Sequence, residues 1–71
     1  MSVSRSIKGY IVASGLNQKQ VAEAIGIHPM SLNRILNDKR KLTIDLYLRI
    51  CETLGVAPGY FVDAEINNVH R

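Results

Sequence analysis

Short runs of apolar residues at helical spacing recur along this 71-residue chain, separated by residues that start or stop helices. The clearest pattern lies in the middle, between Asn17 and Asn37. Asn17 is a good N-cap residue, and Gln20 follows three positions later, as in a capping box. The next apolar residues share one helical face: Val21, Ala22 and Ile25. The pattern predicts a short helix that ends at Gly26.

The same stretch predicts a second helix, over residues 29–37, after a sharp turn. Gly26 breaks the pattern, and glycine readily adopts the positive φ that a tight turn needs. Pro29 suits the first helical position, where its missing N–H would be unpaired anyway. One side of this helix is apolar and faces inward: Leu32, Ile35 and Leu36. The opposite side consists of Met30, Asn33, Arg34 and Asn37. Asparagine and arginine can bind base edges bidentately, although an ordinary solvated face has the same composition.

Further helical patterns lie on both sides of this pair. A first helix is expected to begin at Ser2 or Ser4 and to stop at Gly15. A fourth helix is expected between Thr43 and Gly55, and its broad apolar stripe predicts a centrally packed element. The stripe consists of Ile44, Leu46, Tyr47, Leu48, Ile50, Cys51 and Leu54.

A short fifth helix is predicted after Pro58, and it carries Tyr60, Phe61 and Val62. Periodicity is lost from residue 63. We therefore predict one domain over residues 1–66 and a frayed tail over residues 67–71. The expected fold class is all-α, a compact arrangement of five helices.

This ordered set of features resembles the DNA-binding unit of the phage Cro and lambda-repressor family. The resemblance covers about residues 3–62, including the closing phrase LGVAPGYFVD, and it is carried by the spacing of Gln18, Ala22, Gly26, Ile27 and Ile35. It implies a lambda-repressor-like helix-turn-helix domain with residues 29–37 in the major groove of DNA. The family often has serine or threonine at position 28, polar base readers at the start of this helix and glycine at position 38. This chain departs from that pattern at His28, Pro29, Met30 and Asp38.

Two sets of DNA-contacting residues follow from this interpretation. The expected base-reading set is His28, Pro29, Met30, Ser31, Asn33, Arg34 and Asn37. The expected phosphate-binding set is Asn17, Gln18, Lys39, Arg40 and Lys41. Backbone contacts of this kind would give affinity and register, while the helix reads the sequence.

Several of these positions also have simpler interpretations. The run from Lys39 to Lys41 is also typical of a solvated loop, and Gln18 is also an ordinary surface residue at a helix start. Histidine is a poor N-cap, so the ring of His28 either points at a phosphate or a base or has a structural role within the protein. Arg5 and Lys8 lie on the polar side of the first helix, where they either reach phosphates or are simply solvated.

Composition narrows the function classes. The net charge of +3 and pI near 9.4 suit a polyanionic partner, although many unrelated small proteins share them. Cys51 is the single cysteine, which excludes an internal disulfide and favours a small core residue. Neither a signal peptide nor a membrane span is visible, so the expected location is the cytoplasm. The carboxylates are scattered and the two histidines lie far apart, so the chain offers no pair suited to acid–base catalysis and no metal-binding cluster. We therefore expect neither an enzyme nor a protein with a metal, a cofactor or a small-molecule substrate.

The leading hypothesis is a sequence-specific, double-stranded DNA-binding transcriptional regulator of phage or bacterial type, with repression as its expected role. A homodimer on a palindromic operator is expected, because one small module makes too few base contacts to define a site in a genome. Its dimer surface is expected around Tyr60, Phe61 and the tail. The alternative is an antitoxin-like or anti-repressor module that holds a protein partner. RNA binding is a third possibility, but the chain offers no aromatic platform for stacking single-stranded bases.

Overall fold

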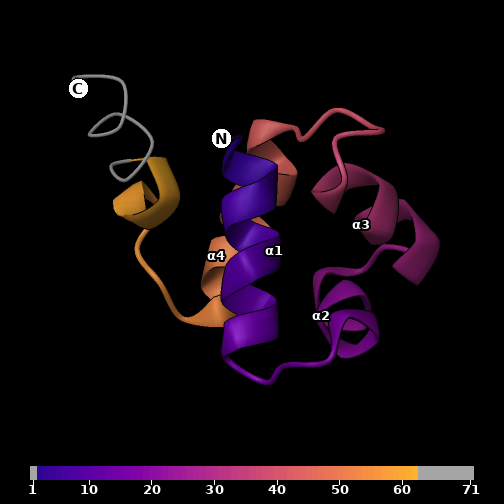
Figure 1. The fold of residues 1–71 in the computed structure, drawn as a ribbon, viewed down its shortest axis with the longest axis horizontal. Helices are drawn as coiled ribbons and strands as arrows, with labels where there is room; N and C mark the ends of the chain where they lie inside the picture. Colours follow the sequence, from indigo (N-terminus) through magenta and orange to yellow (C-terminus); the bar gives the residue numbers. More distant parts are fainter. Residues whose placement is uncertain (1, 63–71) are drawn as a thin grey trace.

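A computed structural model describes residues 2–62, and every regular element within them is helical. The elements are α1 (Val3–Ala13), α2 (Gln18–Ile25), α3 (Pro29–Leu36), α4 (Ile44–Leu54) and a last helical turn over residues 59–62. In Figure 1, α1 crosses in front of α4, with α2 and α3 on one side and the last turn on the other. The predicted all-α fold is confirmed. The predicted domain end at residue 66 and the tail over 67–71 lie outside the described residues.

Helices α1, α2 and α4 begin where a polar side chain accepts a hydrogen bond from an otherwise unpaired backbone N–H. The caps are Ser2 for α1, Asn17 for α2 and Thr43 for α4, and each accepts at 3.2 Å from the N–H three residues on. Asn17 was predicted as a cap, and α4 begins directly after Thr43, as expected from the sequence. Of the two serines considered for α1, Ser2 is the cap and Ser4 is buried.

A single hydrophobic core joins the helices. It consists of Ile7, Ile11, Val21, Ala22, Ile25, Leu32, Leu36, Ile50, Cys51 and Phe61. Helix α2 packs against both α3 and α4, and α1 packs against α3. Cys51 is only 1% exposed, which confirms its prediction as a small core residue. The pair α2–α3 is therefore supported from both sides by the rest of the domain.

Helix α4 is less deeply packed than its apolar stripe predicted. Its buried residues, Ile50 and Cys51, both lie in its second half. By contrast, Ile44 is 79% exposed and Leu48 is also exposed. The expectation that the whole stripe is central is therefore wrong. The spacing correctly grouped these side chains, but in the first half of the helix the core is reached only partly, by Tyr47, and leaves Ile44 and Leu48 exposed.

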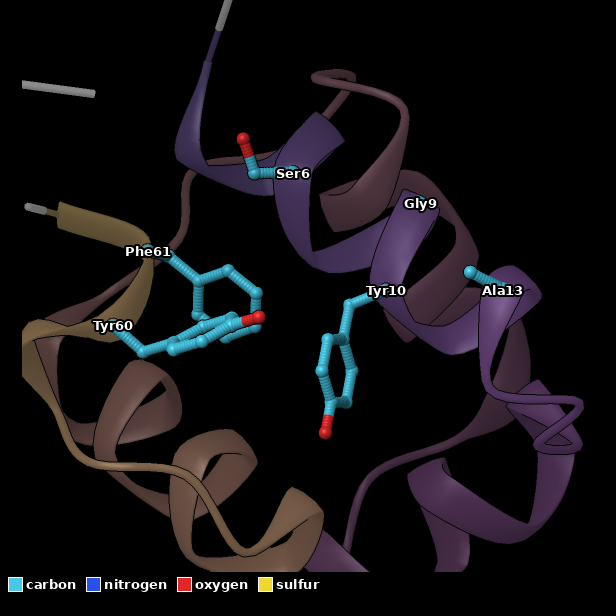
Figure 2. Close-up of a pocket in the computed structure, with 6 residues that line it drawn as sticks. All are labelled: Ser6, Gly9, Tyr10, Ala13, Tyr60 and Phe61. Atoms are coloured by element: carbon cyan, nitrogen blue, oxygen red, sulfur yellow. The ribbon is translucent and has the colours of Figure 1, made fainter. Parts of the chain in front are cut away.

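The last helical turn closes the core with an aromatic cluster. Phe61 is 2% exposed, and its ring lies edge-on to Tyr10 and Tyr60 at centroid distances of 5.7 and 5.0 Å. Figure 2 shows the side chains of Tyr10, Tyr60 and Phe61 turned toward one another. The three rings line an open groove of about 480 Å³. Because Phe61 is buried within its own domain, it is not available for the dimer contact that we expected from the sequence. Tyr60 is exposed and remains accessible.

A hydrogen bond from Tyr47 fixes the path of the chain between α4 and this last turn. The phenol donates to the backbone carbonyl of Pro58. Burial, followed by the neighbouring Cys51, raises the pKa of Tyr47 above its ordinary value. The hydroxyl therefore keeps its proton, and remains a donor, to higher pH than a free tyrosine.

Candidate nucleic-acid interface

The turn between α2 and α3 determines how the second helix of the pair leaves the core. Gly26 has φ of +84°, the left-handed conformation that its position in the sequence predicted. The N–H groups of Gly26 and Ile27 both donate to the carbonyl of Ala22 at 3.0 Å. Two donors on one carbonyl close the end of α2 tightly. Ile27 packs against the core, so the turn is anchored by its side chain as well as by its backbone.

Helix α3 begins with a histidine cap. Pro29 occupies the first turn as predicted, and Nδ1 of His28 accepts a hydrogen bond from the N–H of Met30 at 3.1 Å. The expectation that His28 would be a poor cap is therefore corrected. An unprotonated imidazole nitrogen is a good acceptor, and here it lies near the N–H groups that a serine or threonine would satisfy. The helix ends at Leu36, one residue earlier than predicted, with Asn37 as its C-cap.

The two sides of α3 separate cleanly into a buried and an exposed face. On the inner side, the buried residues are Leu32, Ile35 and Leu36. On the outer side, the exposed residues of the helix are Met30, Asn33 and Arg34. Pro29 and Ser31 are half-buried at its entrance, and His28 is exposed just before it. We call the side chains of Met30, Asn33 and Arg34 the outer face of α3.

Neighbouring contacts orient several side chains on this surface. Nη2 of Arg34 lies 3.9 Å from Sδ of Met30, one helical turn earlier. A thioether is a weak acceptor, so this contact places the guanidinium without satisfying all of its donors. Nη1 of Arg40 donates to Oγ of Ser31 at 3.3 Å. The basic loop after α3 therefore folds back toward the first half of the helix.

The C-terminal end of α3 is fastened to α1. Nζ of Lys8 donates to Oδ1 of Asn37 at 2.6 Å, and Nδ2 of Asn37 donates to the carbonyl of Asn33 at 2.8 Å. Both ends of the Asn37 amide therefore have partners within the protein. From the sequence, Lys8 was expected either to bind a phosphate or to be solvated. It instead binds Asn37 within the protein.

The next residue adds an ion pair to the same junction. Asp38 has φ of +59°, where the resembling family commonly has glycine. Its carboxylate accepts from Oγ of Ser2 at 3.0 Å and from Nε of Arg5 at 3.2 Å. These partners stand more than thirty positions away in the chain, so no local pattern indicated them. The only hint was the unusual aspartate itself, at a position that favours glycine.

The predicted phosphate-binding residues lie at both ends of the helix pair. Lys39, Arg40 and Lys41 are exposed after α3, whereas Asn17 and Gln18 lie at the start of α2. The oxygen of Asn17 is already used as the α2 cap. Between residues 29 and 41 the only carboxylate is Asp38, which is paired with Arg5. The four cations of this stretch, Arg34 and Lys39 to Lys41, therefore face solvent with little local compensation.

Other kinds of site receive no support from the described part of the chain. Residues 2–62 contain no cluster of three side chains suited to holding a metal ion. Over the same residues, none of the helices has the combined length and apolarity needed to span a bilayer.

Comparison with known proteins agrees with this geometry. A family model described as helix-turn-helix matches residues 7–61, well over half of the chain. The match includes all of α2, α3 and α4 and most of α1. Searches of curated proteins and of solved structures found no match. The chain therefore belongs to the Cro and lambda-repressor-like family of helix-turn-helix DNA-binding regulators.

Proposed function

We propose that the protein is a sequence-specific transcriptional repressor of phage or bacterial type that inserts α3 into the major groove. The observation that carries this proposal is the exposed outer face of α3, opposite a fully buried inner side. A helix held in this way presents side chains to base edges without disturbing the core. Such a regulator acts in the cytoplasm, where bacterial DNA lies.

The residues of the outer face have different roles in this proposal. Arg34 donates to guanine, Asn33 pairs with adenine, and Met30 contacts a thymine methyl group. His28, Pro29 and Ser31 lie at the entrance of the helix and form the margin of the reading surface. Asn37 contributes least, because reading a base would first require its amide to leave Lys8 and the Asn33 carbonyl.

Phosphate contacts flank this reading surface. Lys39, Arg40 and Lys41 bind the backbone on one side, and Gln18 with the start of α2 binds it on the other. Asn17 supports this end by capping α2. With about six phosphates neutralised, log K should fall with log salt at a slope of about −5.

We place the protein on a palindromic operator as a homodimer, with half-sites about 34 Å apart. The exposed Tyr60, beside the groove of Figure 2, is the candidate for the dimer contact within the described residues. Light scattering tests this placement, because Tyr60→Ala should yield a monomer, while Phe61 keeps its edge-on contact with Tyr10. A dimer mass for this variant would move the contact elsewhere.

The decisive experiment is selection of bound duplexes from a random DNA pool, followed by measurement of affinity for the selected site. A palindromic consensus bound at least about 10³-fold more tightly than random duplex supports the proposal. Binding without sequence preference would leave a DNA-binding protein but remove the specific reading by α3.

A module that binds a protein partner is the second candidate. The exposure of Ile44 and Leu48 on α4 favours it, because these apolar side chains lie one turn apart on an uncovered surface. A mobility shift of random duplex DNA at low salt separates the two candidates. A protein-binding module would leave the duplex unshifted.

A further inference from the structure

The two sulfur-bearing side chains within residues 2–62 have opposite surroundings. Cys51 is buried in the core, whereas Met30 is 57% exposed on the outer face of α3. Peroxides oxidise sulfur that they can reach. Within this part of the chain, the exposed sulfur-bearing side chain therefore lies on the surface that we propose reads DNA.

The environment of Met30 makes its oxidation state consequential. Nη2 of Arg34 already points at Sδ of Met30, at 3.9 Å. A thioether holds this guanidinium weakly, so Arg34 can leave it for a guanine. A sulfoxide oxygen at the same place would be a much stronger acceptor and would hold Arg34 more firmly. It would also replace an apolar contact surface with a polar one.

We propose that Met30 is an oxidation-sensitive residue of the reading surface, and that its conversion to the sulfoxide by hydrogen peroxide weakens binding to the preferred DNA site. This inference rests on the proposed function. In the reaction, a sulfur lone pair attacks one peroxide oxygen and the O–O bond breaks. The new S–O bond forms, and the other oxygen leaves as water with both peroxide protons. Sulfur loses two electrons, and the peroxide gains them.

The fold should survive this change. The side chain of Met30 lies outside the core, and its backbone N–H donates to the ring of His28 whatever the state of the sulfur. Oxidation therefore alters the surface of α3 without opening a cavity beneath it. Circular dichroism should show the same helix content and melting behaviour before and after treatment.

The experiment treats the full chain with hydrogen peroxide and measures affinity for the DNA site selected from a random pool. Trypsin separates the two methionines, because Met30 falls in the peptide of residues 20–34 and Met1 in that of residues 1–5. Mass spectrometry then quantifies each sulfoxide. We expect about a tenfold loss of affinity in proportion to oxidation of Met30, and recovery after treatment with methionine sulfoxide reductases.

Two variants complete the test. Met30→Leu keeps an apolar side chain of similar size but cannot be oxidised, so peroxide should not change the affinity measured for this variant before treatment. Met30→Gln carries a polar acceptor and should bind about as weakly as the oxidised protein. Unchanged affinity after oxidation, resistance of Met30 to peroxide, or equal peroxide sensitivity of Met30→Leu would overturn this inference. Failure of the untreated protein to select any site would instead overturn the proposed function.

Discussion

Helices α3 and α4 are both amphipathic, but they relate to the core in different ways. The inner side of α3 is buried throughout, and its outer face carries a basic group and an amide. In α4 the second half is buried, while Ile44 and Leu48 leave apolar surface exposed in the first half. The two helices therefore differ in what they expose. Helix α3 exposes polar side chains above a fully buried side, whereas α4 exposes apolar side chains in its first half.

The difference arises from what packs against each helix. A tight glycine turn joins α3 to α2. Helix α1 packs against α3 and also forms polar contacts with the C-terminal end of α3. Helix α4 contacts α2 chiefly, and its first half leaves Ile44 and Leu48 outside the core. Apolar periodicity therefore shows which side of a helix avoids water, but the neighbouring helices decide how much of that side is covered.

The largest expected effect comes from the support beneath α3. Leu36→Ala removes a fully buried side chain and should lower the free energy of unfolding by about 2–5 kcal/mol. For a domain of this size, that is a large part of the total stability. Urea denaturation followed by circular dichroism measures it. A loss below about 1 kcal/mol would mean that the inner side of α3 is not the anchor described here.

The next effect concerns binding rather than folding. Arg34→Ala should weaken binding to the selected site by about 1–3 kcal/mol and relax the preference at one base pair, because one bidentate contact is lost. Unfolding should hardly change, since the side chain is exposed. Lys39→Ala is the matched control, expected to weaken all duplexes nearly equally. An unaltered consensus for Arg34→Ala would move the reading surface to other residues.

A smaller effect is expected at the entrance of α3. His28→Ala leaves the N–H of Met30 without its acceptor and should lower the free energy of unfolding by about 1 kcal/mol. His28→Asn offers a better capping oxygen and should restore or exceed the original stability. Thermal denaturation of the three proteins compares them directly. Equal stability of His28→Ala would show that the ring contributes nothing as a cap.

The smallest effect is expected at the exposed end of α4. Ile44→Ser should change the free energy of unfolding by less than about 0.5 kcal/mol, because the side chain is largely in water already. Parallel urea titrations of Ile44→Ser and Leu36→Ala test the comparison between the two helices. A loss above 1 kcal/mol for Ile44→Ser would mean that α4 is covered, for example by another chain.

The local features of the fold were predictable from the sequence. The cap at Asn17, the left-handed Gly26 and the proline at the start of α3 each depend on residues within a few positions. The two sides of α3 were equally predictable, because a short helix with three inward apolar residues has one possible packing side. These features identified the helix-turn-helix before any distant contact was known.

The features that sequence reasoning missed depend on contacts between distant segments. The pairing of Asp38 with Arg5 and of Asn37 with Lys8 joins two helices across about thirty positions. The exposure of Ile44 depends on where the core ends, which its own spacing cannot show. His28 was misjudged for another reason, since general capping preferences describe average behaviour and an unprotonated ring nitrogen can accept where a hydroxyl usually does.

The cap at His28 also determines the tautomer of its ring. Because Nδ1 accepts from the N–H of Met30, its lone pair is engaged, and the proton of the neutral imidazole must reside on Nε2. The ring is exposed, so this Nε2–H remains a donor directed away from the backbone that Nδ1 caps. One side chain thus starts the helix with one nitrogen and keeps a hydrogen-bond donor at the second, the kind of group that a phosphate oxygen accepts from.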